Sequence, residues 1–333
     1  MTTESDRKAI AAVGSPVVDL VARVPEAFLE TVGGEKGGME LVEEGELARI
    51  LETLPAPPLR ATGGSAGNTA FALARLGAPS RFLGVTGDDA EGDFFQESFA
   101  RIGGDTGRIR TRGAMPTARC LSLVTPDGER TMRTHLGAAA SLAAADIAPG
   151  DFSGCAHVHV EGYLLFDPDL MVHVLEAARA AGCTTSVDLA SFEVVSAARA
   201  MLPALLEKFV DMVFANGEEA AAYAGTSSPG VCLEKLAEGC DIAAVKYGAD
   251  GALLRDARAS YRVPARPVDR VVDTTGAGDL WAAGFLFGLE QGRGLARCGE
   301  WGAILGAAAV RHEGAQLPDA EWKRLNGRIE AAL

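Results

Sequence analysis

In the second half of the chain, short apolar runs alternate with segments of helical period. The runs at 157–160, 184–189 and 212–215 have the length of buried strands, whereas 168–181 and 196–209 place apolar residues at helical spacing. This alternation predicts successive βαβ units, and therefore an α/β fold with a mainly parallel central sheet covered by helices on both faces. Such sheets bind ligands at the carboxyl ends of their strands, so we expect the chemistry in the loops that follow strands.

Two stretches in the first half of the chain interrupt this pattern. Residues 19–60 contain several glycines and a proline cluster, and show little regular period. Residues 118–135 alternate polar and apolar side chains around a Pro-Asp-Gly turn at 126–128, which is typical of a β-hairpin. We interpret the two stretches as a small β lid, formed by approximately 16–60 and 110–137. The alternative is an ordinary hairpin at the edge of the main sheet.

Composition limits what the protein binds. The 333 residues are 48% hydrophobic and 23% charged, which fits a single large domain over 1–333. The net charge of −14 disfavours nucleic acid and anionic membrane as partners, so any phosphate must be bound locally by backbone amides, a helix N-terminus or a divalent cation. Six scattered cysteines indicate reduced thiols, and no apolar stretch is long enough to span a bilayer. A cytoplasmic location follows as an expectation.

The most informative segment is VVDTTGAGDLWAAGFLFGL at 271–289. It predicts a strand end at 271–272, then a turn at Gly276-Ala277-Gly278, then a helix that begins at Asp279. Glycines let the backbone approach a ligand, and the amides of a first helical turn point at it, so the turn is a candidate anion site. Asp279 makes chemical sense there if it accepts the proton of an attacking hydroxyl while the amides stabilise a transferred phosphoryl group. The alternative is a plain glycine turn with Asp279 as a helix cap.

Other motifs were weighed against this one. The chain lacks a Walker-type G-x-x-x-x-G-K-[ST] pattern and the third glycine of a dinucleotide fingerprint. Ser65 lies in a G-x-S-x-G pattern with His312 downstream, which leaves a serine hydrolase as a remote alternative. That reading needs a buried strand before the serine, but 54–62 is rich in proline. His157 and His159 alternate on a strand, where packed histidines are favoured over a metal pair because no third ligand is near in sequence.

Two signatures together resemble the ribokinase/PfkB family of sugar and nucleoside kinases. DTTGAGD at 273–279 is similar to the C-terminal signature of that family, and GGSAGN at 63–68 to its N-terminal one, in the same order. The similarity continues through GVTGD at 84–88 and GAQ at 314–316. The resemblance implies a three-layer αβα ribokinase-like fold and ATP-dependent phosphoryl transfer to a sugar or nucleoside hydroxyl, with Asp279 as the catalytic base.

The resemblance also assigns roles by position. It implies that the Gly276, Ala277 and Gly278 amides stabilise the phosphoryl group. It implies acceptor contacts from five residues: Asp19, Gly63, Gly64, Asn68 and Glu161. It implies contacts to ATP from four others: Asn216, Lys246, Gly248 and Gly251. It implies that Glu219 organises Mg²⁺ through water, and that Asp273 and Thr275 form a site for a monovalent cation such as K⁺. Read without the family, Asn216 is a helix cap with Glu219 at the third helical position.

The acceptor is less sharply indicated. Val17 and Val18, just before Asp19, are apolar as in bacterial adenosine-kinase-like members, and an apolar wall suits the face of a base. We therefore expect a nucleoside, adenosine first, with a free sugar such as ribose or fructose, or a sugar phosphate, as the alternatives. Phe166, Phe192 and Met132 are candidates to cover a base, although each also fits plain packing. A monomer and a homodimer both stay open.

Overall fold

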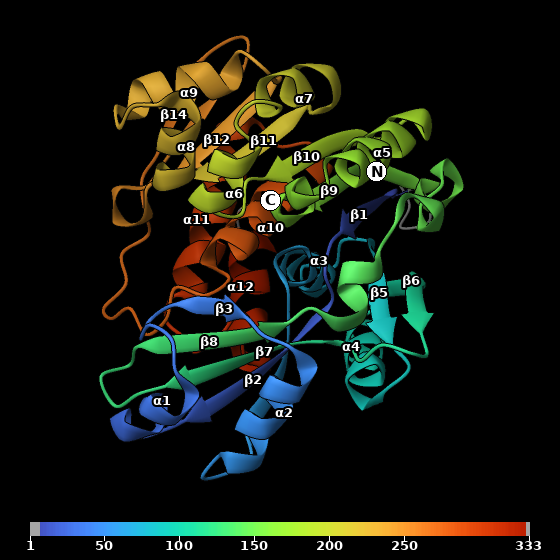
Figure 1. The fold of residues 1–333 in the computed structure, drawn as a ribbon. Helices are drawn as coiled ribbons and strands as arrows, with labels where there is room; N and C mark the ends of the chain where they lie inside the picture. Colours follow the sequence, from blue (N-terminus) through green and yellow to red (C-terminus); the bar gives the residue numbers. More distant parts are fainter. Residues whose placement is uncertain (1–6, 331–333) are drawn as a thin grey trace.

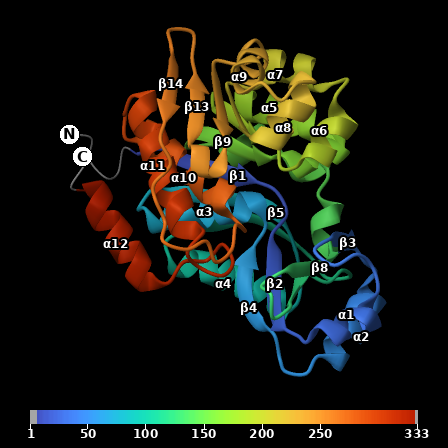
Figure 2. The same cartoon turned by 90° about the vertical axis from the view of Figure 1, so that its left-hand side faces the viewer.

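The computed structural model describes residues 7–330 and contains two separate sheets (Figure 1). The larger has nine strands between two layers of helices, so the expected αβα fold with a mainly parallel central sheet is confirmed. The smaller has five strands and lies below the central sheet in both Figures 1 and 2. The predicted hairpin belongs to this second sheet and not to an edge of the first.

The central sheet is parallel from β12 to β6, and β13 and β14 add an antiparallel ribbon at one edge. In spatial order its strands are β14 (Ser260–Val263), β13 (Ala252–Arg255), β12 (Ile242–Lys246), β11 (Met212–Asn216), β10 (Thr184–Asp188), β9 (Cys155–Glu161), β1 (Ala9–Val13), β5 (Ser80–Gly87) and β6 (Asp105–Arg112). The strand order reverses between β1 and β9. Sheets of this kind bind ligands at such a reversal, beyond the carboxyl ends of the strands.

The two helical layers follow from the alternation of side chains along the strands. In β11, Met212 and Phe214 are buried against one layer, and Val213 and Ala215 against the other. The first layer comprises α3 (Ser65–Arg75), α10 (Ala277–Glu290), α11 (Leu295–Ala309) and α12 (Asp319–Glu330). The second comprises α5 (Pro168–Ala180), α6 (Phe192–Ala198), α7 (Leu202–Phe209), α8 (Gly217–Ala224) and α9 (Pro229–Ala237). Beside β5 and β6 lies α4 (Ala90–Arg101).

One expected helix differs from the structure. The segment 196–209 was expected to be one helix, but it contains the end of α6 and the whole of α7. Pro203 is the reason, since proline has no amide hydrogen to donate and is tolerated only in the first turn of a helix. A new helix therefore begins at Leu202.

The five-stranded sheet is the lid. Its strands are, in spatial order, β3 (Met39–Leu41), β8 (Arg130–His135), β7 (Ala118–Val124), β2 (Val17–Arg23) and β4 (Leu59–Gly63). Two helices cover its outer face, namely α1 (Glu26–Val32) and α2 (Glu44–Thr53). The lid differs slightly from the expected ranges, because β4 continues to Gly63 and residues 110–112 belong to β6 of the central sheet.

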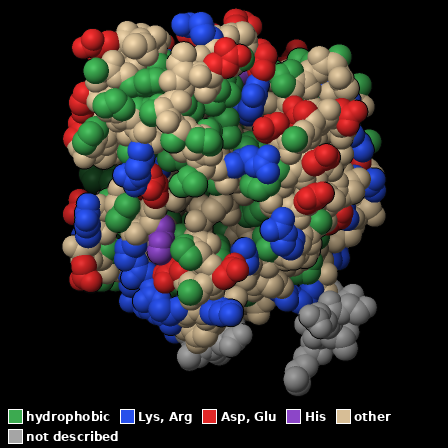
Figure 3. Space-filling model, turned by 90° about the horizontal axis from the view of Figure 1, so that it is seen from below, with side chains coloured by type: hydrophobic (Ala, Val, Ile, Leu, Met, Phe, Trp, Pro, Cys, Tyr) green, Lys and Arg blue, Asp and Glu red, His purple; other side chains and the backbone are tan. Residues whose placement is uncertain are grey.

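Surface and thiol chemistry agree with the composition. Figure 3 shows acidic and basic side chains interspersed on the face seen from the lid side. The six cysteines are all free thiols, as the sequence predicts. Across residues 7–330, no helix combines the length and hydropathy that crossing a bilayer requires.

Candidate active site

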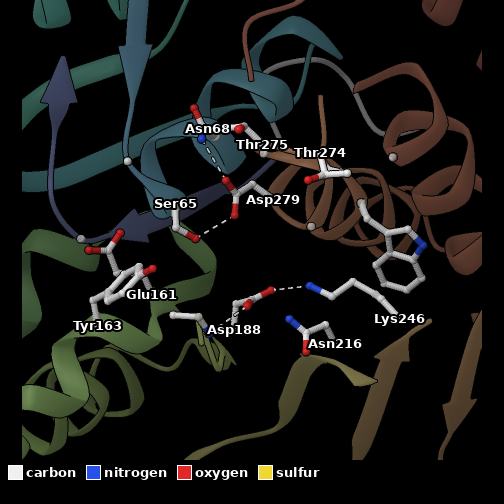
Figure 4. A pocket seen from close by; sticks show the side chains of 18 of the residues that line it. Ser65, Asn68, Glu161, Tyr163, Asp188, Asn216, Lys246, Thr274, Thr275 and Asp279 are labelled. Carbon is white, nitrogen blue, oxygen red and sulfur yellow. Dashed lines mark hydrogen bonds and ion pairs between the residues drawn. The ribbon is translucent and has the colours of Figure 1, made fainter. Parts of the chain in front are cut away.

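Four parallel strands bring polar side chains to one edge of the central sheet. Glu161 ends β9 beside Asp188 of β10, and Asn216 ends β11 beside Lys246 of β12. A cavity of about 1420 Å³ lies between this edge, the lid and the N-terminus of α10 (Figure 4). Pockets for one small molecule are typically about 300–1,000 Å³. The cavity therefore has room for two ligands side by side.

Asp279 lies in the first turn of α10 and points into this cavity (Figure 4). Ser65 donates its hydroxyl hydrogen to Oδ1 at 2.8 Å, and the Asn68 amide donates to Oδ2 at 2.9 Å. Burial raises the pKa of Asp279 to about 6, against these two hydrogen bonds, which favour the ionised form. Each oxygen keeps a lone pair, so at neutral pH the carboxylate can accept a further proton from a bound hydroxyl.

The anion site predicted at residues 276–278 forms the start of α10. Gly276 has φ +72°, and a Cβ there would lie 2.3 Å from that of Ala315, so the turn requires glycine. The Ala277 amide already donates to the Thr274 carbonyl at 3.2 Å, which leaves the amides of Gly276 and Gly278 as candidates for a phosphate. A Cβ on Gly278 would lie 3.2 Å from Lys246 Nζ, so a cation borders the same turn.

Two local expectations about this segment are wrong. The helix begins at Ala277, two residues before Asp279. Residues 271–272 form no strand, because the Val272 amide bonds the carbonyl of Val310 at the end of α11 and not a neighbouring strand.

Sequence reasoning missed Asp188. Its Oδ2 lies 2.7 Å from Lys246 Nζ, and both side chains are largely buried in the cavity wall (Figure 4). Burial alone would lower the pKa of Lys246, but Asp188 and Glu219 raise it above its ordinary value, so the lysine stays charged. The available signal was position, since Asp188 is the last residue of a predicted parallel strand.

The other side of the cavity is the inner face of the lid. We use this name for the alternate residues that face the cavity from β2, β3, β7 and β8: Val17, Asp19, Met39, Leu41, Cys120, Met132 and Thr134. The carboxylate of Asp19 lies over Gly63, where a Cβ would be 2.4 Å from Oδ2. Burial raises the pKa of Asp19 to about 7, although the nearby Arg130 lowers it. Gly64, with φ +83°, caps α3 at the cavity wall.

Glu161 lines the cavity but is almost wholly buried. Its two oxygens accept backbone hydrogen bonds from Ser15 at 2.9 Å and from Ala66 at 3.1 Å. These bonds join the end of β1 to the start of α3 across the strand reversal. Burial raises the pKa of Glu161 to about 7. Its contact with an acceptor stays a prediction.

Asn216 and Glu219 form a reciprocal cap at the start of α8. The Asn216 side chain accepts from the Glu219 amide at 2.9 Å, and the Glu219 carboxylate accepts from the Asn216 amide at 2.8 Å. Both line the cavity, and burial raises the pKa of Glu219 to about 7. A carboxylate with a lone pair left on each oxygen fits a water-linked Mg²⁺, which keeps most of its own waters.

Some of the remaining candidate residues line the cavity, and others are packed elsewhere in the fold. Gly248 and Gly251 line the cavity beyond Lys246, as does Phe166, whereas Phe192 does not. His157 donates to or accepts from Thr184 and Ser186, and His159 does so with Ser186; burial lowers their pKa to about 3 and about 4. They are packed histidines, as favoured above. Within the described residues no cluster of three acidic, histidine or cysteine side chains suits a metal ion.

Comparison with known proteins shows the family to which the chain belongs. Residues 58–323 match the profile of the pfkB family carbohydrate kinases. The chain belongs to that family. Its members are ATP-dependent phosphotransferases that act on carbohydrates or nucleosides. The hydrolase alternative is therefore set aside, and Ser65 donates its hydrogen bond to Asp279 instead of to a histidine.

Several similar proteins are named as kinases of ribosides or sugars. The chain is 31% identical to aminoimidazole riboside kinase from Salmonella typhimurium over 266 residues, covering 77% of this chain and 81% of the relative. Among solved structures, adenosine kinase from Sinorhizobium meliloti is 33% identical with a TM-score of 0.86, covering 98% of this chain and 100% of that one. A probable sugar kinase from Rhizobium etli has the same identity and TM-score, covering 98% and 99%. The expected kinship with the ribokinase-like kinases is confirmed.

Proposed function

We propose that this kinase phosphorylates the primary hydroxyl of a nucleoside, adenosine first, with MgATP as the donor and Asp279 as the base. The observation that carries the proposal is the inner face of the lid. There the Asp19 carboxylate, which can accept hydrogen bonds from two vicinal hydroxyls, lies on the same sheet face as the apolar Met39, Leu41 and Met132. A ribose with a flat apolar base attached matches both parts of this surface.

The neighbouring cavity wall supports the same acceptor. Tyr163, Leu136 and Phe166 add apolar surface near the lid. A free ribose or fructose would leave this surface uncovered. A sugar phosphate would bring a second anion close to the carboxylates of Asp19, Glu161 and Asp279, which disfavours its binding.

The residues divide the reaction between them. Asp279 accepts the proton of the acceptor hydroxyl, while Ser65 and Asn68 orient its carboxylate. The Gly276 and Gly278 amides and the Lys246 ammonium stabilise charge on the transferred phosphoryl group. When bound near Glu219, Mg²⁺ would neutralise charge on the phosphates. A cytoplasmic location and the absence of nucleic-acid partners stay predictions.

The test measures kcat/KM by ADP release with MgATP, for adenosine, ribose, fructose and ribose 1-phosphate. Adenosine should give the highest value. The variant Leu41→Ser should lower kcat/KM for adenosine about tenfold and leave that for ribose unchanged, because Leu41 faces the cavity from an exposed strand. Leu59→Ser is the matched control, since Leu59 is exposed on the opposite edge strand of the lid, outside the cavity. A preference for a free sugar that Leu41→Ser does not alter would contradict the nucleoside assignment.

A further inference from the structure

An arginine of the lid reaches the loop that precedes the anion site. Arg130 of β8 places Nη2 2.8 Å from Asp273 Oδ2, and its Nη1 donates to Thr275 Oγ1 at 3.1 Å. The exposed fractions of the two charged side chains are only 13% and 9%. Asp273 and Thr275 are the residues for which the family resemblance implies a monovalent-cation site. A side-chain cation therefore already contacts both of them.

The carboxylate of Asp273 has little capacity for another ligand. Its Oδ1 accepts from the amide of Thr275 at 3.1 Å and from the hydroxyl of the same residue at 2.8 Å. Its Oδ2 accepts from the Gly314 amide at 2.6 Å in addition to facing Arg130. Oδ1 thus has a hydrogen-bond donor for each of its two lone pairs, and Oδ2 has one donor and the charged Nη2 of Arg130 at ion-pair distance. The residues present do not fit a K⁺ ion that needs this carboxylate, because the ion would have to displace the guanidinium.

We propose that Arg130 takes the place of the monovalent cation, so that the kinase works without K⁺ and receives this charge from the lid. A guanidinium remains protonated at any physiological pH, and its planar fork can contact a carboxylate and a hydroxyl together. Asp273 and Thr275 lead directly into Gly276, whose left-handed conformation shapes the anion site. The ion pair therefore orders the backbone that receives the phosphate. Because Arg130 is a lid residue, the position of the lid and the order of this backbone segment are coupled.

The electrostatics around Arg130 agree with this role. Arg130 also lowers the pKa of Asp19, so the lid arginine acts on a carboxylate of the lid as well as on Asp273. Glu313 lies 3.9 Å from it and makes a second lid contact with Arg23 at 2.9 Å. The Arg23 pair is largely exposed, at 76% for the arginine, and does not involve Asp273. It joins the same lid to the neighbouring loop that follows α11, and so provides a control for the loss of a lid arginine.

The test measures the affinity for a non-hydrolysable MgATP analogue by calorimetry. The wild-type protein, Arg130→Gln and Arg23→Gln are compared in potassium chloride and in tetramethylammonium chloride at equal ionic strength. Wild type and Arg23→Gln should bind equally in both salts, within about twofold. Arg130→Gln should bind about tenfold more weakly in tetramethylammonium, since it loses a charge-assisted contact, and recover in part when K⁺ or guanidinium is added.

Three outcomes would overturn the proposal. The first is a wild-type protein whose affinity rises tenfold or more with K⁺. The second is an Arg130→Gln variant that binds as wild type does in both salts. The third is a variant that is weakened in every salt and regains nothing with either cation, since the guanidinium would then act on the nucleotide itself. Equal thermal midpoints of Arg130→Gln and Arg23→Gln would exclude misfolding of the lid. No acceptor is present, so the result is independent of the proposed nucleoside specificity.

Discussion

At the scale of single residues, the proposed chemistry depends on the protonation state of Asp279. Burial raises its pKa, whereas the hydrogen bonds from Asn68 and Ser65 lower it, and the balance places the pKa at about 6. In the proposed mechanism the ionised form is the base, so kcat/KM should rise with pH through about 6 and level off above it. Ser65 matters here because its hydrogen bond to the carboxylate favours the ionised form.

We expect Ser65→Ala to move this acidic limb to higher pH by about one unit. Removing a donor to the carboxylate destabilises the charged form, and a hydrogen bond to a charged group contributes roughly 1.5–3 kcal/mol, where one pKa unit corresponds to about 1.4 kcal/mol. The measurement is kcat/KM between pH 5 and pH 9. Thr69→Val is the control, since Thr69 bonds the backbone carbonyl of Asp279 and not its carboxylate. An unshifted limb in Ser65→Ala would show that the serine does not tune the base.

At the scale of elements, the N-terminus of α10 is the critical piece. Its first residues follow a left-handed turn at Gly276, which fits against Ala315 with no space for a side chain. The shape of the proposed anion site therefore depends on this one backbone conformation.

Gly276→Ala should lower both stability and turnover. The left-handed conformation costs alanine about 1 kcal/mol, and the clash with Ala315 displaces the helix start. We expect a lower thermal midpoint and a kcat reduced at least about tenfold, measured on the same preparation. Gly327→Ala, in the open surface of α12 where a Cβ meets nothing within 4 Å, should keep full activity and gain slightly in stability. Wild-type turnover in Gly276→Ala would show that the turn at Gly276 does not shape a phosphate-binding site.

The elements that could be predicted from the sequence are those with a local signal. The spacing of apolar residues predicts the parallel strands from β9 to β11, and the glycine pattern before Asp279 indicates a candidate anion site. Side chains joined only by tertiary structure could not be found in this way. Asp188 forms an ion pair with a lysine 58 residues away, and Arg130 of the lid forms one with Asp273 in the loop before α10. The break between α6 and α7, in contrast, has a local signal, since Pro203 marks the start of a new helix.

At the scale of the whole molecule, the cavity gathers carboxyl groups whose pKa burial has raised: Asp19, Glu161, Glu219 and Asp279. Each binds protons more readily in the folded than in the unfolded protein, so its contribution to stability falls as pH rises. The buried His157 and His159 act in the opposite direction, since the unfolded chain binds their protons more readily. A variant of one carboxyl group isolates its contribution to the pH dependence of the free energy of unfolding.

Asp19→Asn should stabilise the empty protein at high pH while it weakens acceptor binding. The pKa of Asp19 rises from 3.8 to about 7 on folding, so its cost appears as pH increases from about 4 to about 7 and is constant above. The difference in unfolding free energy between variant and wild type, from urea titrations, should grow over that range. Asp127→Asn, an exposed lid residue whose pKa is lowered, should show the opposite sign. A difference that does not change with pH would mean that Asp19 is not buried as described.

The role proposed for Asp279 as the base of a phosphoryl transfer is tested by comparing wild type with Asp279→Asn. ADP release with MgATP and adenosine is measured for wild type and Asp279→Asn, alongside calorimetric affinity for MgADP. Asn keeps the shape and the helix position but cannot accept the proton. If Asp279 is the base, kcat of Asp279→Asn should be lower by about 10²–10⁴-fold and the affinity for MgADP unchanged. Wild-type turnover in Asp279→Asn would contradict this role.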